Sequence, residues 1–369
     1  MIYSLLKSPY RLEKAYYKKD VGIMIEKPFL KQSSRNGEID LFRFIFAVIV
    51  FSFHFEYAPA IFKSGYLCVE FFFVLSGYFL MQYIEKNKNT AINPTTTICN
   101  YAKNRLKRLY ASYFIACVAA YAIRFLVLSD ISIRTVINKG IWEILMLQTL
   151  GFEFSTTVVW YVSALLIASL ILYLLSYCLK DYFLPVIFFG SIVIFAFLCQ
   201  KNHQLSSMNN LLIVSDGLLR GLAELSLGCI LFKLTKAFPD SLNKLKKFLF
   251  IPKYLSLAII LYFMTKDAGV KNFSCLILIV FFIAMLFLDE SPIHKAFNHK
   301  LCYFLGDISY DFYLNQIIVI YLARAFPSIL LQKYPIVTFI AFIAVDLVLS
   351  LITKRISKIA ISQIIKKIA

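Results

Sequence analysis

The chain has 369 residues, of which 60% are hydrophobic and only 16% are charged. With a mean hydropathy of +0.73, this composition excludes an ordinary soluble domain, which holds fewer apolar and more charged residues. The net charge of +18 gives no support for nucleic-acid binding, because basic residues also mark the cytoplasmic side of membrane proteins and attract anionic lipid. We therefore expect a polytopic membrane protein whose partners include membrane lipids and no nucleic acid.

Residues 1–36 are rich in Lys and Arg and lack the apolar stretch and cleavage site of a signal peptide, so we expect a basic cytoplasmic tail. Ten later segments are apolar and long enough to cross a bilayer as helices. These segments are 41–58, 66–84, 109–128, 158–179, 183–200, 211–232, 249–264, 273–289, 304–325 and 335–353. The expected fold is an all-α polytopic membrane protein with about ten transmembrane helices in one bundle, which covers residues 37–356. Residues 357–369 would form a second basic cytoplasmic tail.

Basic residues are concentrated on one side of these segments. If the N-terminus is cytoplasmic, most Lys and Arg fall in the inner tails and loops, as the positive-inside rule requires. This multi-pass protein would then lie in the cytoplasmic (inner) membrane, with both termini in the cytoplasm. The apolar stretch 140–152 is too short to cross and is expected to lie at the outer interface or to re-enter the membrane. The eight cysteines form no Cys-x-x-Cys pair, so we expect small apolar residues without a metal site or disulfides.

The first segment carries Arg43 and, eleven residues later, His54. Eleven steps of about 100° return a helix to within about 20° of its starting direction, about 16 Å further along, so both side chains share one face. The second segment runs back inward, which puts Glu70 at a depth similar to that of His54. A carboxylate beside an imidazole fixes its tautomer and supports its charged form, as a general base needs. A lone His is commonly structural, but titratable groups within a membrane favour function, so we expect His54 and Glu70 to be catalytic.

The second inner loop carries Arg105 and Arg108 together with Lys103 and Lys107. Basic residues at the cytoplasmic end of a span are explained by membrane orientation alone. An arginine fork also binds phosphate through two parallel hydrogen bonds, which would suit a phosphorylated ligand on the cytoplasmic side. The loop itself leaves both interpretations open.

Asp216, Arg220 and Glu224 recur every four residues in the sixth segment and so share one helical stripe. They form either a neutralised ladder of buried charges or a wall of a substrate cavity. Trp160 and Tyr161 open the fourth segment at the outer interface. An aromatic belt is the default explanation for them, and stacking on a sugar is the alternative.

Other polar residues have simpler explanations. Arg124, Arg324 and Asp346 lie nearer the segment ends, where their side chains can reach the interface. Ser76 and Gly77 are expected to allow close packing between helices, since no nucleophile turn surrounds the serine.

Six motifs follow one another along the chain. They are Arg43 with His54, GYLCVEFFFVLSGYFL at 65–80, NRLKRLYASYF at 104–114, VVWYVSALL at 158–166, RGLAELSLG at 220–228 and FLGDISYDFYLNQ at 304–316. As an ordered set they resemble the signature of the acyltransferase-3 family, integral-membrane O-acyltransferases of cell-surface glycans. The last motif departs from many relatives, which end it with His where this chain has Gln316.

The resemblance implies an O-acyltransferase, most simply an O-acetyltransferase, with acyl-CoA (acetyl-CoA) as the donor substrate and no tightly bound cofactor. The acceptor would be a hydroxyl of a cell-surface or lipid-linked glycan, deprotonated by His54. The Arg-x-x-Arg pair, Arg105 and Arg108, would hold the donor phosphates, and Arg43 would line the way to His54. Candidates for the acceptor cavity are Trp160, Asp216, Arg220, Glu224 and Tyr313.

Two other functions compete with this one. A proton-coupled transporter or flippase for a glycan precursor could use the same buried charges as a path, but the chain shows no internal repeat or matching broken spans. A non-catalytic scaffold would leave the buried titratable groups unexplained. The sequence leaves open the acceptor sugar, the acyl chain, a covalent acyl-enzyme and the oligomeric state.

Overall fold

The computed structural model of the protein describes residues 35–87, 94–156, 158–205, 210–211, 214–267 and 269–368. Residues 36–369 form one compact unit. The expected N-terminal tail lies almost wholly outside the described residues, as do residues 88–93, 157, 206–209, 212–213 and 268. The expected C-terminal tail, 357–369, continues the last helix up to Ile368 and stays a prediction.

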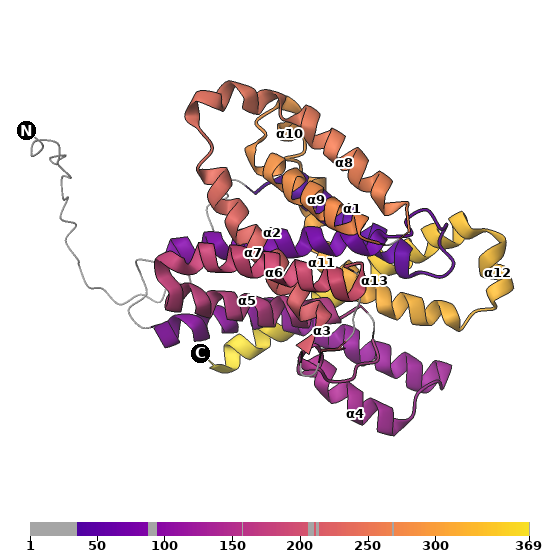
Figure 1. Ribbon diagram of the computed structural model, residues 1–369. Coiled ribbons are helices and arrows are strands. Elements are labelled where there is room, and N and C mark those ends of the chain that lie inside the picture. The colour runs from indigo at the N-terminus through magenta and orange to yellow at the C-terminus, as the bar shows by residue number, and fades with distance from the viewer. Residues whose placement is uncertain are drawn as a thin grey trace, which may run out of the picture. The chain divides into compact units, whose positions relative to one another are not determined.

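The described residues are almost entirely helical (Figure 1). The helices are α1 (Gly37–His54), α2 (Cys68–Asn87), α3 (Pro94–Ile123), α4 (Ile133–Ile144), α5 (Trp160–Leu179), α6 (Phe183–Asn202), α7 (Asp216–Lys236), α8 (Phe250–Met264), α9 (Lys271–Leu288), α10 (Pro292–Ala296), α11 (Lys300–Arg324), α12 (Ser328–Lys333) and α13 (Pro335–Ile368). Single turns or short helices of other types are η1 (Gly65–Leu67), η2 (Arg124–Leu128), η3 (Gln148–Leu150), η4 (Lys180–Tyr182) and η5 (Asp240–Phe248). Strands β1 (Asn210–Leu211) and β2 (Val214–Ser215) pair antiparallel, with Asn210 opposite Ser215.

Five helical stretches among the described residues are long and apolar enough to cross a membrane, or six if the bent pair of η5 and α8 counts as one. They are Gly65–Asn87, Thr95–Leu128, Trp160–Asn202, Lys271–Leu288 and Pro335–Gln363. The stretch Trp160–Asn202 contains two predicted segments, separated where Lys180 takes a positive φ of 48°. An all-α, multi-pass membrane fold is therefore confirmed, whereas the number of about ten crossings stays a prediction.

Helices α2 and α7 run side by side because glycine lets their backbones touch (Figure 1). A Cβ added at Gly77 would lie 2.0 Å from the carbonyl oxygen of Leu225, and one at Gly228 would lie 2.0 Å from that of Val74. Any larger residue would force the helices apart, since backbone atoms cannot move aside like a side chain. The expected role of Gly77 in close packing is confirmed, and this contact positions the charged residues of both helices.

Helix α1 is fixed at its start and along its apolar face. The Asn36 side chain accepts hydrogen bonds from the amides of Glu38 and Ile39, each at 3.1 Å, and thereby caps the helix. Further along, the fully buried Phe46 ring packs edge-on against Phe71 of α2, with centroids 4.7 Å apart. Since one helix carries both residues, this packing fixes Arg43, in the second turn of α1, relative to His54, at its C-terminal end.

Candidate active site

Three arginines gather around the start of α1 and the middle of α3. Arg43 donates to Asp40 over 3.2 Å, and Arg105 donates to the hydroxyl of Tyr101 over 3.0 Å. Arg108 lies within electrostatic range of Arg43 and Arg105. In the part of the chain that the structure describes, Arg108 has no hydrogen-bond or ion-pair partner. The cluster formed by Arg43, Arg105 and Arg108, named here the arginine cluster, can therefore receive an anionic group.

His54 is the last residue of α1 and is half-buried. Its ring meets the edge of Phe53 at a centroid distance of 4.9 Å, and Phe53 in turn packs on Tyr66 at 5.2 Å. Within the described ranges the imidazole has no hydrogen bond and no charged partner. It is thus held by aromatic contacts, with both ring nitrogens unengaged.

The expected pair of His54 and Glu70 does not form among the described residues. Glu70 lies in the first turn of α2, fully buried, and both of its oxygens accept from Arg220 of α7; the Nε–Oε2 distance is 3.0 Å. A guanidinium offers a carboxylate two parallel charged hydrogen bonds, which a neutral imidazole cannot match. Depth alone placed Glu70 beside His54, but the close contact between α2 and α7 brings it to Arg220 instead.

The expected ladder in the sixth segment is divided into two parts. Arg220 also donates to Glu224 over 3.3 Å, so Glu70, Arg220 and Glu224 form a buried triad. Asp216 pairs with Lys201 at the end of α6, over 2.8 Å. The division follows from position, since Asp216 begins α7 and there meets the C-terminal turn of α6.

Trp160 and Tyr161 do not form an aromatic belt. They are only 7% and 6% exposed, which places them inside the bundle. The Arg220 guanidinium lies 5.6 Å from the Trp160 ring, a cation–π contact. Tyr161 lies within electrostatic range of Arg43 and Arg105 of the arginine cluster and of Glu224 of the triad. These two residues therefore belong to the polar interior of the site.

The third candidate aromatic, Tyr313, belongs to the same interior. Its ring lies 5.4 Å from that of Tyr161, and its hydroxyl donates to the carbonyl of Val158 over 3.0 Å. Gln316, one turn further along α11, is fully buried and donates to the carbonyl of Tyr313 over 2.6 Å. Where many relatives have His, this chain thus has a side-chain amide that donates a hydrogen bond to the backbone of its own helix.

Asp346 does not reach the interface, contrary to expectation. It is fully buried in α13 and accepts from Ser350 over 3.2 Å. Arg324 and Arg124 do have outward partners: Arg324 pairs with the exposed Glu56, and Arg124 with Asp130. A position near the end of a predicted segment was a poor guide to burial, because α13 continues well beyond the predicted end at residue 353.

A second buried ionic cluster went unnoticed in the sequence. The Lys253 ammonium lies 2.7 Å from Glu38 and 2.6 Å from Asp289, and the His294 imidazole lies 2.6 Å from Glu38. Glu38, Asp289 and His294 are close enough to share a metal ion, but Lys253 already supplies the positive charge at this place. A lysine within the apolar segment 249–264 was the signal that could have revealed this cluster.

The pKa of Glu38 reflects these contacts. Burial raises it, but hydrogen bonds from His294, Lys253 and Tyr254 outweigh burial and bring the pKa below its ordinary value. Glu38 therefore stays ionised, as a carboxylate held by several donors does.

The short apolar stretch 140–152 forms the end of α4 and the turn η3. Its Glu143 is buried and accepts hydrogen bonds from the Tyr121 hydroxyl at 2.6 Å and from Thr156. Burial raises the pKa of Glu143, although these hydrogen bonds act in the opposite direction. Its contacts serve to fasten the loop 145–156 to α3.

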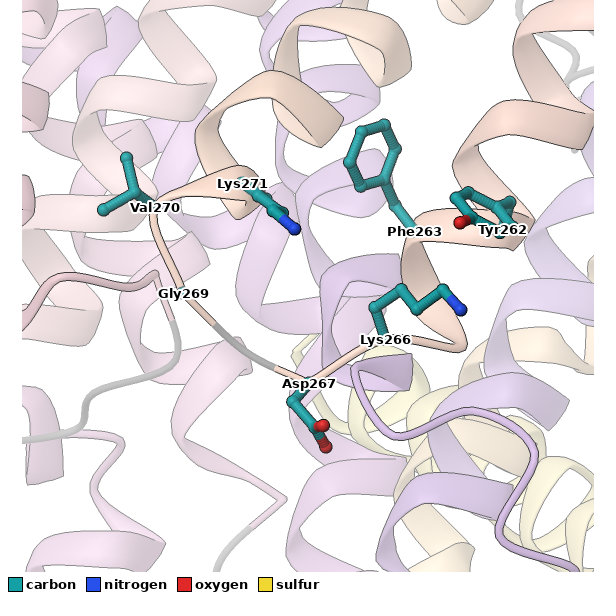
Figure 2. Close-up of a pocket in the computed structure, with 7 residues that line it drawn as sticks. All are labelled: Tyr262, Phe263, Lys266, Asp267, Gly269, Val270 and Lys271. Atoms are coloured by element: carbon teal, nitrogen blue, oxygen red, sulfur yellow. The ribbon is translucent and has the colours of Figure 1, made fainter.

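A cavity of about 510 Å³ opens between the end of α8 and the start of α9 (Figure 2). Its lining residues are Tyr262, Phe263, Lys266, Asp267, Gly269, Val270 and Lys271. The next residue, Asn272, donates to the hydroxyl of Tyr66, whose ring lies 6.0 Å from the Arg220 guanidinium. A hydrogen bond and a cation–π contact thus lead from Asn272, next to the cavity lining, to Arg220 of the triad.

A comparison with known protein families shows which group of proteins this sequence resembles. A family model described as Acyltransferase domain matches residues 36–355. No curated protein and no solved structure matches the chain. The matched range begins at the cap of α1, ends within α13 and contains every site residue described above.

Proposed function

The chain belongs to the acyltransferase-3 family and is a multi-pass membrane acyltransferase, and on this premise we propose its substrates. The donor is acyl-CoA, most simply acetyl-CoA, and the acceptor is a hydroxyl of a cell-surface or lipid-linked glycan. Ten transmembrane helices hold the protein in the inner membrane with both termini in the cytoplasm. The arginine cluster then faces the cytoplasm, and His54 lies toward the outer side.

The arginine cluster supports donor binding from the cytoplasm. Acyl-CoA carries several phosphates and is made in the cytoplasm, and guanidinium forks bind phosphate through paired charged hydrogen bonds. Arg108, which lacks a protein partner among the described residues, is available for such a contact. Arg43 and Arg105 lie near enough to bind further phosphate oxygens.

His54 supports the chemical step. An imidazole with no charged partner within the described ranges is available in its neutral form, and a neutral ring nitrogen can take the proton of the acceptor hydroxyl. The hydroxyl oxygen then attacks the thioester carbon. Because Arg43 and His54 lie about 16 Å apart along α1, the phosphates and the reacting thioester can occupy opposite ends of one elongated donor.

The cavity between α8 and α9 lies on the outer side in the proposed topology and supports an acceptor of sugar type. Its Tyr262 is exposed and offers an aromatic face, while Lys266 and Lys271 offer hydrogen-bond donors. Figure 2 shows these side chains around the opening between the two helices. A glycan bound there would approach the triad by way of Tyr66.

The observation that carries the proposal is the family match over 36–355. It is joined by the arginine cluster beside the first half of α1 and by a histidine at the C-terminal end of α1 that has no polar partner among the described residues. The test uses the full chain in lipid nanodiscs with radiolabelled acetyl-CoA and glycan from cells that lack the protein. Label should pass to the glycan, and mass spectrometry should locate the acylated hydroxyl. Absence of transfer to any glycan would contradict the proposal. Movement of a glycan precursor across vesicles without acyl transfer would establish the flippase instead.

A further inference from the structure

Two carboxyl groups share one guanidinium in the interior of the protein. Glu70 comes from α2, whereas Arg220 and Glu224 lie one turn apart on α7, and none of the three side chains is more than 2% exposed. Both carboxyls contact the same guanidinium, that of Arg220. Two carboxylates that share one guanidinium repel each other, and protonation of one of them removes this repulsion.

The charges of this triad balance only if one carboxyl is neutral. With both ionised, the triad would hold a net negative charge in a fully buried place, where an uncompensated charge is costly. Among the described residues, the groups found near it are neutral: Trp160 and Tyr66 lie against the guanidinium, and the others are Cys68, Cys275, Tyr161 and Tyr313. None of them supplies a second positive charge.

We propose that Glu224 is a carboxylic acid in the resting protein and donates its proton during acyl transfer. Glu70 places both oxygens on Arg220 and so takes the role of the ionised partner. Glu224 makes a single longer contact at 3.3 Å, and its Oε2 finds no donor among the described residues. This oxygen receives no hydrogen bond that would stabilise a carboxylate, so the neutral acid is favoured at rest.

The step in which this proton is used rests on the proposed function. When the acceptor oxygen bonds to the acyl carbon, the carbon–sulfur bond breaks and its electron pair goes to sulfur. His54 takes the proton of the acceptor hydroxyl, and Glu224 protonates the departing thiolate of CoA. Tyr161 interacts electrostatically with Arg43 and Arg105 and also with Glu224, and on this ground we place the thioester of a donor bound at the arginine cluster near this acid. His54 then loses its proton to water and Glu224 regains one, so that no net proton is consumed.

Infrared difference spectroscopy of the full chain in nanodiscs tests the resting proton without any substrate. A protonated carboxyl has a C=O band distinct from that of a carboxylate. We expect one such component to disappear in Glu224→Gln and to shift in Glu224→Asp, with no change in the control Glu153→Gln, whose carboxylate is exposed. Survival of the band in Glu224→Gln overturns the assignment. So does failure of Glu224→Gln to fold, because the amide mimics the neutral acid.

A leaving-group comparison tests the step. With acetyl-CoA, Glu224→Gln should lower kcat about 10²-fold or more, with KM little changed. In an acetyl-CoA analogue with an aromatic thiol and the same phosphates, the leaving group is a weakly basic thiolate that needs no proton from Glu224. With this donor, most of the loss in Glu224→Gln should therefore be recovered. An equal loss with both donors overturns the role of Glu224 while wild-type transfer upholds the proposed function. If the wild type transfers no acyl group, the proposed function fails. The infrared result alone then decides whether Glu224 is protonated in the resting protein.

Discussion

Single substitutions of Arg105 and Arg108 test donor binding most directly. Replacing either by Ala should weaken acyl-CoA binding, because each removes a guanidinium from the arginine cluster. Lys at the same position should restore binding only in part, since an ammonium lacks the planar fork. Titration of acyl-CoA onto the protein in nanodiscs measures both effects. If the double Ala variant reaches normal membrane levels and binds acyl-CoA with unchanged affinity, these residues serve only to set the membrane orientation.

Glu38 makes folding sensitive to acid. Its pKa is lowered in the folded protein from an ordinary value of 4.5, because donor contacts outweigh burial. A carboxyl with a lowered folded pKa contributes stability that is complete above its unfolded pKa and is lost as pH falls through the folded one. Thermal stability in detergent should therefore fall below about pH 4.5, and Glu38→Gln should be less stable at pH 7 with a shallower fall. An identical acid profile in wild type and Glu38→Gln would contradict this account, and Glu153→Gln serves as the control.

Single residues also mark the limit of what the sequence predicted. The shared face of Arg43 and His54 followed from helical periodicity, and both lie on α1 as expected. The partner of Glu70 could not be predicted, because Arg220 is 150 positions away in the chain. Depth along a span orders residues in one dimension, whereas pairing depends on which helices are neighbours.

Substitution of Gly77 tests the close packing of α2 against α7. Gly77→Ala would bring a Cβ to 2.0 Å from a backbone oxygen of α7, so the helices must separate and the triad between them must loosen. We expect a loss of folded protein by size-exclusion chromatography and a lower melting temperature. Gly190→Ala is the matched control, because no atom lies within 4 Å of its new Cβ and Ala is the better helix former. Equal stability of the two variants would show that α2 and α7 tolerate separation.

The existence of the helices was easier to predict than their arrangement. Long apolar segments such as 66–84 and 335–353 fold into α2 and α13, because backbone groups in a membrane must be satisfied within the segment. Breaks and extensions were less visible, since α13 continues to Ile368 and the ionic cluster of Lys253 depends on three other elements. Contacts between distant elements leave little trace in local composition.

Orientation is the prediction for the whole molecule. The excess of basic residues on one side predicts cytoplasmic termini, with His203 and Lys333 in outer loops. Reporter fusions at the C-terminus should be active only for a cytoplasmic reporter, and single cysteines at the two loop positions should react with an impermeant reagent from outside. A C-terminus found outside would overturn both the ten spans and the cytoplasmic position of the arginine cluster.

His54→Ala tests the central claim most directly. If His54 takes the proton of the acceptor hydroxyl, its loss should lower acyl transfer by about 10²- to 10⁴-fold, while the protein stays inserted and still binds acyl-CoA. The matched control is His203→Asn, which replaces a loop histidine of positive φ by a residue that tolerates this conformation and should leave the rate unchanged. Transfer rates measured with saturating donor in the same nanodiscs decide the question. Near-normal transfer by His54→Ala would contradict the active-site assignment even though membership of the family stands.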